Sequence, residues 1–142
     1  MTVKIIYKDN CCNIDWDEIP KILSAAGMSY SDPEVHKKAF NNSYITVFAF
    51  YNENLIGFGR AISDGVYQAA IYDLAILPEY QGKGVGRELL KKITDTIPNC
   101  NYILYAAPGK EGFYEKSNFR KMRTAMALFN NAEEKREKGF IE

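Results

Sequence analysis

The stretch from Asp73 to Leu90, DLAILPEYQGKGVGRELL, decides the fold. It begins inside an apolar run that predicts a buried strand, and Pro78-Glu79-Tyr80 breaks that run. Glycines follow at positions 82, 84 and 86, and the residues after them place apolar side chains at helical spacing. The stretch therefore predicts a strand, a glycine-rich turn and a helix.

This succession of elements suits an anion. The three glycines allow unusual backbone angles and a close approach of the main chain to a ligand. The first N–H groups of a helix have no internal partner, and the helix dipole favours negative charge there. Lys83 and Arg87 add positive charge beside the turn. We predict that residues 82–87 hold a phosphate or pyrophosphate.

Length and composition restrict the other possibilities. The 142 residues predict one domain over residues 1–142, with a charged tail from residue 130. Lys plus Arg and Asp plus Glu are both 18, which argues against a nucleic-acid surface. No apolar run approaches the ~18 residues of a membrane span and the start does not resemble a signal peptide, so we expect a cytoplasmic protein without membrane contact.

The cysteines and the histidine lack the spacing of a metal site. Cys11, Cys12 and Cys100 are expected to be free thiols. The one histidine, His36, lies among charged residues and is expected at the surface. A lone histidine also argues against a His-rich metal site or a Ser-His-Asp triad.

The remaining chain supplies strands and helices on both sides of this stretch. Strands are expected at 3–7, 44–51, 55–63, 68–77, 101–106 and 122–129, and helices at about 17–26, 33–40, 84–96 and 109–117. We expect the tail from Asn130 to be poorly fixed. The order predicts a mixed α+β fold, a mostly antiparallel sheet with about four helices and one β-loop-α-β crossover.

Two sequence motifs follow one another along the chain. The first is Gln81-Gly82-Lys83-Gly84-Val85-Gly86, and the second is Phe113-Tyr114-Glu115-Lys116-Ser117-Asn118-Phe119. Together they resemble the acetyl-CoA loop and the Phe-Tyr-x-(Lys/Arg)-x-Gly-Phe motif of the GNAT superfamily of N-acetyltransferases. Asn118 replaces the usual glycine, and since Asn also tolerates a left-handed helix end, the same turn is predicted. A dinucleotide loop would instead open a repeated βαβ pattern.

The resemblance implies acetyl-CoA as co-substrate, no metal, and a sheet that splays at the middle of the 68–77 strand, with the thioester in the gap. The backbone of Leu74, Ala75 and Ile76 would hold the pantetheine arm as an added strand does. The pyrophosphate would lie on Gln81, Gly82, Lys83, Gly84, Val85, Gly86 and Arg87. The amine would attack the thioester directly.

Two side chains are candidates for the proton transfers. By the resemblance, Tyr114 stands at the general-acid position for the leaving thiolate; the alternative is an aromatic that packs its helix. Asp73 is the one carboxylate in an apolar strand and is a candidate base; the alternatives are a structural acid bonded across the sheet, or proton loss through water. Strand alternation predicts that Asp73 shares a face with Ile71 and Ala75. The N–H of Ile76 is a candidate polariser of the carbonyl.

The acceptor is predicted to be the primary amine of a small molecule. Residues 54–64 and 67–77 also resemble arylalkylamine (serotonin) N-acetyltransferase-like proteins, which favours an aryl or alkyl amine. The residues expected to line its pocket are Tyr30, Phe48, Phe58, Arg60, Tyr67 and Tyr105. Two alternatives remain, a protein or peptide N-acetyltransferase and a non-catalytic acetyl-CoA-binding regulator. The resemblance also makes a homodimer an expectation.

Overall fold

The computed structural model describes residues 4–142 and consists of two compact units, which meet in the sequence between Leu104 and Tyr105. Val3, the predicted start of the first strand, lies outside the described residues. The single domain expected over residues 1–142 stays a prediction.

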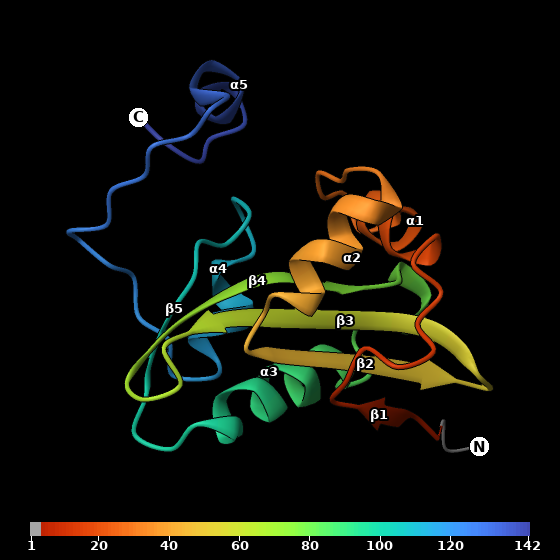
Figure 1. Cartoon of the computed structure of the whole chain (residues 1–142). Coiled ribbons are helices and arrows are strands. Elements are labelled where there is room, and N and C mark those ends of the chain that lie inside the picture. Colours follow the sequence, from red (N-terminus) through yellow and green to blue (C-terminus); the bar gives the residue numbers. More distant parts are fainter. Residues whose placement is uncertain (1–3) are drawn as a thin grey trace. The chain divides into compact units, whose positions relative to one another are not determined.

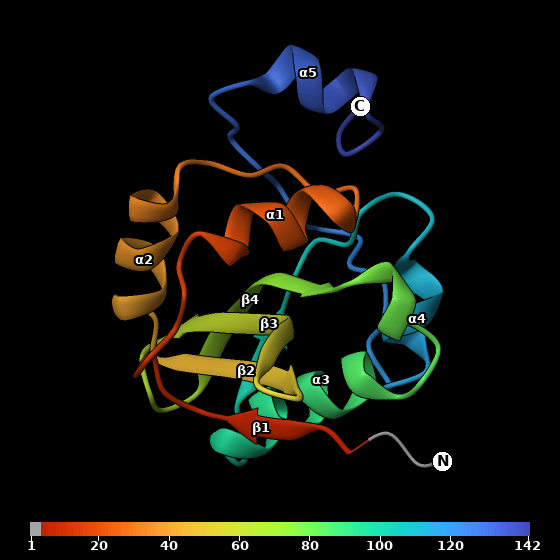
Figure 2. The same ribbon diagram turned by 90° about the vertical axis from the view of Figure 1, so that its right-hand side faces the viewer.

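The first unit is a five-stranded sheet in the order β1-β2-β3-β4-β5, with helices on both faces (Figures 1 and 2). β1 to β4 are antiparallel, and β5 runs parallel to β4 after the crossover through α3. The strands are β1 (Ile6–Lys8), β2 (Ile45–Tyr51), β3 (Asn54–Ser63), β4 (Gln68–Ile76) and β5 (Asn101–Ile103). The helices are α1 (Glu18–Ala25), α2 (Pro33–Asn41), the 3-10 turn η1 (Pro78–Tyr80) and α3 (Val85–Thr96). The predicted fold class is confirmed.

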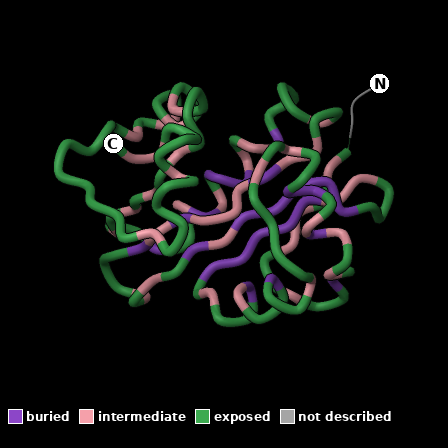
Figure 3. The backbone as a smooth tube through the Cα atoms, turned by 90° about the horizontal axis from the view of Figure 1, so that it is seen from above, coloured by how far each residue is buried: buried purple, intermediate pink, exposed green. Residues whose placement is uncertain are grey.

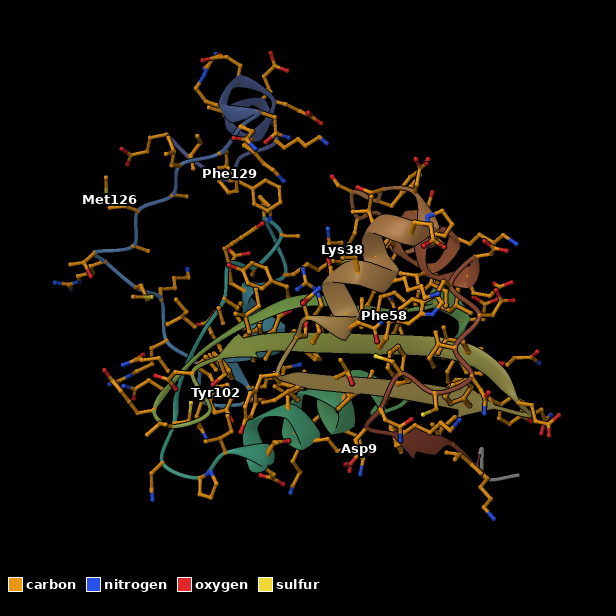
Figure 4. All side chains as sticks on the ribbon, in the orientation of Figure 1. Asp9, Lys38, Phe58, Tyr102, Met126 and Phe129 are labelled. Atoms are coloured by element: carbon orange, nitrogen blue, oxygen red, sulfur yellow. The ribbon has the colours of Figure 1, made fainter. Side chains whose placement is uncertain are left out.

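Each face of the sheet has its own buried layer, and the buried segments follow the strands in Figure 3. On the side of α1 and α2, the ring centroid of Phe40 lies 5.5 Å from that of Phe48 and 5.7 Å from that of Phe58. Phe58, labelled in Figure 4, is fully buried. On the opposite face, α3 buries the predicted apolar positions, namely Val85, Leu89, Leu90 and Ile93. The two layers fix β3 and β4 from both sides.

The β2–β3 hairpin closes with two residues in the left-handed region. Asn52 and Glu53 have φ of 49° and 68°, the angles of a type I′ turn that matches the right-handed twist of its strands. Asn54 already pairs with Tyr51, so the turn is one residue shorter than the three residues left between the strands expected at 44–51 and 55–63.

His36 is buried, so its predicted place at the surface is wrong. Its side chain is on the inner face of α2 together with Phe40 one turn later, and the residue is 7% exposed. Its Nε2 accepts a hydrogen bond of 2.9 Å from the Ser31 N–H. The charged neighbours in the sequence occupy the outer face of the same helix.

The second unit is helical in its regular parts. It contains α4 (Glu111–Glu115) and α5 (Ala132–Glu137), and none of its described residues is assigned to a strand. The strand expected at 122–129 is therefore wrong: Met126 and Leu128 are almost completely exposed. Alternating side chains alone do not make a strand, because its backbone groups need a neighbouring strand as partner.

The tail from Asn130 contains α5 and makes ring contacts within the second unit, while its expected poor fixation stays a prediction. Around α5, the Lys135 Nζ lies 4.5 Å from the ring centroid of Phe140 and 5.3 Å from that of Phe129. Both rings meet Tyr105 edge-on, at 5.5 and 5.8 Å between centroids. This small aromatic cluster was not predicted, because the sequence of the tail is mostly charged.

Candidate functional site

The glycine turn forms an open, uncapped helix start. Gly82 and Gly84 have φ of 76° and 86°, and a Cβ added at either would meet nothing within 4 Å. Gly84 is the N-cap of α3 without a side-chain cap, and the first bond back to it comes from the Glu88 N–H at 3.0 Å. The N–H groups of residues 85–87 thus have no partner within the helix. Gly86 lies in the first helical turn and has no positive φ.

Charge near the turn is positive and accessible. Lys83 and Arg87 are exposed, whereas the side chain of Val85 is buried, which leaves only its backbone for a ligand. The Lys83 Nζ lies 5.7 Å from the ring centroid of Tyr80, the last residue of η1. Open backbone donors, a helix N-terminus and two cations match the chemistry of a pyrophosphate.

Gln81 joins this turn to the strand before it. Its side-chain amide donates a 2.9 Å hydrogen bond to the Ile76 carbonyl at the end of β4. The predicted contact of Gln81 with pyrophosphate stays a prediction, and the side chain has this local bond in addition. The loop and β4 are therefore held together by the first residue of the loop motif.

The far half of β4 has an open edge. β5 pairs only with Gln68, Ala69 and Ala70, so from Ile71 onward the paired neighbour of β4 in the first unit is β3. The Leu77 N–H donates to the Ile56 carbonyl at 2.8 Å, and in an antiparallel ladder the adjacent Ile76 then directs its peptide groups to the other edge. The Ile76 N–H thus points away from β3, toward the edge where the resemblance implies a gap.

A bulge interrupts β4 within this open edge. Phe58 pairs with Ala75 and Arg60 with Tyr72, so Asp73 and Leu74 lie opposite the single residue Gly59. Asp73 has φ of 55°, a left-handed angle in the middle of a strand. The extra residue resets which side chains face α2 and which face α3.

The predicted alternation across this strand is wrong for that reason. Tyr72 pairs with Arg60, and Ala75 packs in the core with Phe58, so both face α1 and α2. Leu74 lies on the α3 face, where its Cδ1 would be 2.9 Å from a Cβ at Gly59. The Asp73 carboxylate reaches Arg60 on the face of Ala75, whereas Ile71 pairs with Ala61 on the opposite face, so Asp73 and Ile71 do not share a face as predicted.

The carboxylate of Asp73 bonds across the sheet. Its Oδ2 accepts a 2.8 Å hydrogen bond from the Arg60 Nε, and the two side chains are only 24% and 14% exposed. Arg60 also donates to the Ser43 Oγ at 3.3 Å. Arg60 was expected to line the acceptor pocket, and its pairing with Asp73 was missed. A single arginine and a single aspartate in two neighbouring apolar strands were the available signal.

Tyr114 belongs to the second unit, whereas the other predicted site residues belong to the first. It lies in α4, edge-on to Phe113 and Phe119 at 5.0 and 5.9 Å between ring centroids. Burial raises the pKa of Tyr114, which keeps the phenol protonated at neutral pH, the form that an acid catalyst needs. Asn118 has φ of 71° and follows the helix end, as predicted.

The sequence model of the Acetyltransferase (GNAT) family matches residues 9–119. The chain belongs to the GNAT family. An uncharacterized N-acetyltransferase ycf52-like protein from Prochlorococcus marinus is 34% identical over 113 residues, which cover 75% of this chain and 63% of the relative. A probable acetyltransferase from methicillin-resistant Staphylococcus aureus has a TM-score of 0.77 at 26% identity, with 90% of this chain and 98% of that chain covered.

Two other GNAT relatives have names that state an acceptor, and the two acceptors differ. Serotonin N-acetyltransferase 2, chloroplastic, from rice is 34% identical over 67 residues, 45% of this chain and 34% of the relative. Histone acetyltransferase TAP1 from soybean is 29% identical over 116 residues, 77% of this chain and 48% of the relative. The family is therefore shown, while the acceptor is not.

The predicted lining of the GNAT acceptor pocket needs correction. Phe48 and Phe58 are fully buried in the core and cannot line it, because both face the packed layer under α1 and α2. Another row of apolar residues lies on the same face of the sheet: Ile62 pairs with Ala70, and Ala70 with Ile103. Ile62 and Ile103 are each about half exposed.

The structural findings on metal sites and membrane helices concern residues 4–142. In that range no group of three or more His, Cys, Asp or Glu side chains is placed to hold a metal ion. No helix of the described chain has the length and apolarity to cross a lipid bilayer. Cys11, Cys12 and Cys100 are not in disulfides.

Proposed function

We propose that this chain transfers the acetyl group of acetyl-CoA to the primary amine of a small molecule with an apolar body. The observation that supports it most is the succession of an open β4 edge and an uncapped α3 start with two left-handed glycines. The thioester supplies the acetyl group: a C–N bond forms, the C–S bond breaks, and one proton passes from the amine toward the thiolate.

The residues of the first unit would hold and orient the donor. The Ile76 N–H at the open edge would donate to the thioester oxygen, where negative charge develops during attack. The backbone of residues 82–87, with Lys83 and Arg87, would hold the pyrophosphate. Leu74 and Ala75 would complete the strand edge along the pantetheine arm.

The protons need a donor and an acceptor. Tyr114 would protonate the leaving thiolate, as the resemblance implies; burial raises the pKa of its phenol, which keeps it protonated at neutral pH but also makes it a weaker acid than a free phenol. Asp73 as acceptor of the ammonium proton stays a hypothesis, and its bond to Arg60 competes with that role. Loss of the proton through water is the alternative.

The apolar row of Ile62, Ala70 and Ile103 supports an acceptor with an apolar body, because it lies on the face of Arg60 and Tyr72 beside the bulge. The partial match to a serotonin N-acetyltransferase also favours an arylalkylamine. The match to a histone acetyltransferase supports the alternative of a protein acceptor. We further propose a homodimer in the cytoplasm that binds no nucleic acid.

An amine panel with detection of free thiol tests the proposal. Tryptamine, phenethylamine, spermidine and a lysine-containing peptide are compared at fixed acetyl-CoA, and we expect the two arylalkylamines to release CoA fastest. Thiol release with the peptide alone would favour the protein acetyltransferase. Tight acetyl-CoA binding without thiol release on any amine would favour the regulator, and absence of an acetyl-CoA-dependent thermal shift would overturn the donor site.

A further inference from the structure

Asp73 is the point at which β4 leaves regular strand geometry. Its φ of 55° is strained for a residue with a Cβ, even though Asp tolerates this region better than most residues do. Such an angle persists only when the surroundings hold it. The question is which contact of Asp73 does so.

Arg60 is the residue bonded to the Asp73 carboxylate, and its guanidinium is fixed from several sides. Nε donates to Asp73 at 2.8 Å and Nη1 donates to the Ser43 Oγ at 3.3 Å. The guanidinium carbon lies 5.8 Å from the ring centroid of Phe40 and 5.3 Å from that of Tyr72. The planar guanidinium of an arginine can form these hydrogen bonds and ring contacts at the same time, whereas the ammonium of a lysine cannot.

This arrangement links α2 to the bulge. The Ser43 hydroxyl that accepts from Arg60 donates in turn to the Ala39 carbonyl of α2 at 2.7 Å. The chain of contacts therefore runs from the end of α2 through Ser43 and Arg60 to Asp73. It fixes the bulge from outside the strand.

The bulge decides which peptide groups reach the open edge. Without the extra residue, every position of β4 beyond it would change its face and the direction of its peptide groups. Leu74 and Ala75 would exchange faces, and the Ile76 N–H would turn toward β3. The geometry of the proposed donor edge thus depends on the angle at Asp73.

We propose that Arg60 is a positioning residue: its ion pair with Asp73 holds the β4 bulge and so shapes the strand edge that receives acetyl-CoA. The identity of the ligand rests on the proposed function. The role of Arg60 differs from that of an acceptor contact, because it acts through Asp73 and not on the amine.

The test is an epistasis experiment on acetyl-CoA affinity. We expect Arg60→Met to weaken binding by about tenfold or more, because it leaves Asp73 both strained and without its cation. Asp73→Gly adopts the left-handed angle without strain. The double variant Arg60→Met/Asp73→Gly should therefore bind within about threefold of Asp73→Gly alone, and more tightly than Arg60→Met.

Acetyl-CoA affinity distinguishes the positioning role of the Arg60–Asp73 pair from a role of Asp73 as the general base, because loss of a base lowers turnover and leaves acetyl-CoA binding intact. Lys21→Met removes an exposed ion pair of α1, to Glu18 at 3.5 Å, and should leave affinity unchanged. If Arg60→Met does not fold, Arg60→Lys retains the charge without the fork and should show the same pattern with a smaller amplitude.

Hydrogen exchange gives a readout that needs no ligand. The Leu77 N–H, bonded to Ile56 beyond the bulge, should exchange faster in Arg60→Met and be restored in the double variant. Unchanged affinity and exchange in Arg60→Met, or a double variant no better than Arg60→Met, would overturn the inference. A wild-type chain that does not bind acetyl-CoA would overturn the proposed function, and the exchange comparison would still decide the role of Arg60.

Discussion

Asp73 in β4 and Gly84 at the start of α3 share a left-handed backbone, with φ of 55° and 86°. Gly84 needs no outside support, because glycine has no Cβ and the surrounding space is open. Asp73 has a Cβ, and a left-handed L-residue costs roughly 1–2 kcal/mol. The angle of the loop is set locally, whereas that of the bulge is set by contacts from β3 and α2.

This difference predicts where each region is vulnerable. The loop is disturbed by a side chain added at the glycine itself. The bulge is disturbed by a change at Arg60, which is thirteen residues away in the sequence. Variants in both regions should lower acetyl-CoA binding, by different physical routes and by different amounts.

The largest effect is expected at the loop. Gly84→Val places a β-branched side chain at φ of 86°, which distorts the N-cap of α3 and misplaces its free N–H groups. We expect acetyl-CoA affinity to fall by about a hundredfold, or roughly 3 kcal/mol. Isothermal titration with acetyl-CoA measures it.

Gly27→Val is the matched control for this variant. Gly27 has φ of 77° with open space around its Cβ position, and it lies after α1, outside the loop. It should lose a similar amount of unfolding free energy while it retains acetyl-CoA affinity. Equal losses of affinity in the two variants would mean that general destabilisation, and not the loop, explains the result.

A variant outside both regions should separate chemistry from binding. Tyr114→Phe removes the proposed acid and keeps the ring that contacts Phe113 and Phe119. Turnover should fall by about ten- to thirtyfold, less than the usual range for a lost acid because the CoA thiol is itself a good leaving group. Acetyl-CoA affinity should stay within about twofold.

The raised pKa of Tyr114 also predicts how the turnover ratio of wild type to Tyr114→Phe depends on pH. The acid acts in its protonated form, so its contribution is complete at low pH and is lost as pH rises through that pKa. Because burial raises the pKa, wild-type turnover should not lose this contribution below about pH 10. Wild type and Tyr114→Phe should therefore differ by a constant factor from pH 6 to 9. Equal turnover would remove Tyr114 from the mechanism.

The two regions also show what the sequence could predict. Strand, glycine turn and helix α3 followed from local patterns, whereas the left-handed Asn118 followed from the family resemblance, because it stands where the motif usually has a glycine. The bulge could not be predicted, because apolar alternation contains no signal for one extra residue held by a partner on another strand. The predictions of a surface position for His36 and of a strand at 122–129 were wrong for related reasons, because burial and strand pairing depend on neighbours that are distant in the sequence.

Two glycines of β3 test how tightly the bulged strand is packed. A Cβ at Gly57 would lie 2.9 Å from the backbone carbonyl oxygen of Ala75, which cannot move without shifting β4. At Gly59 the closest atoms are the side-chain ends of Leu74 and Ile93, at 2.9 and 3.1 Å, which can rotate away. We expect Gly57→Ala to cost about 2 kcal/mol of unfolding free energy and Gly59→Ala about 1 kcal/mol or less.

Urea denaturation measures both variants, and each serves as control for the other. The reverse order would show that the bulge leaves room at β4 and that the α3 face is the more rigid one. A small loss at Gly57 together with unchanged acetyl-CoA affinity would also mean that the strand edge tolerates displacement. The dependence of the donor site on the exact bulge geometry would then be weaker than proposed.

The smallest effect is expected where the two regions join. Gln81→Leu removes the 2.9 Å bond from the side-chain amide to the Ile76 carbonyl and retains a side chain of similar size. One such bond at an exposed site contributes about 1 kcal/mol, so acetyl-CoA affinity should fall by about fivefold. Asn42→Leu removes a comparable 2.8 Å bond to the Lys38 carbonyl at the end of α2 and should leave affinity unchanged.

If Gln81→Leu binds acetyl-CoA as tightly as wild type, the loop keeps its place without the bond to β4, and the two regions act independently. A loss far above fivefold would instead indicate that Gln81 also contacts the pyrophosphate, since a tie between loop and strand contributes only one hydrogen bond.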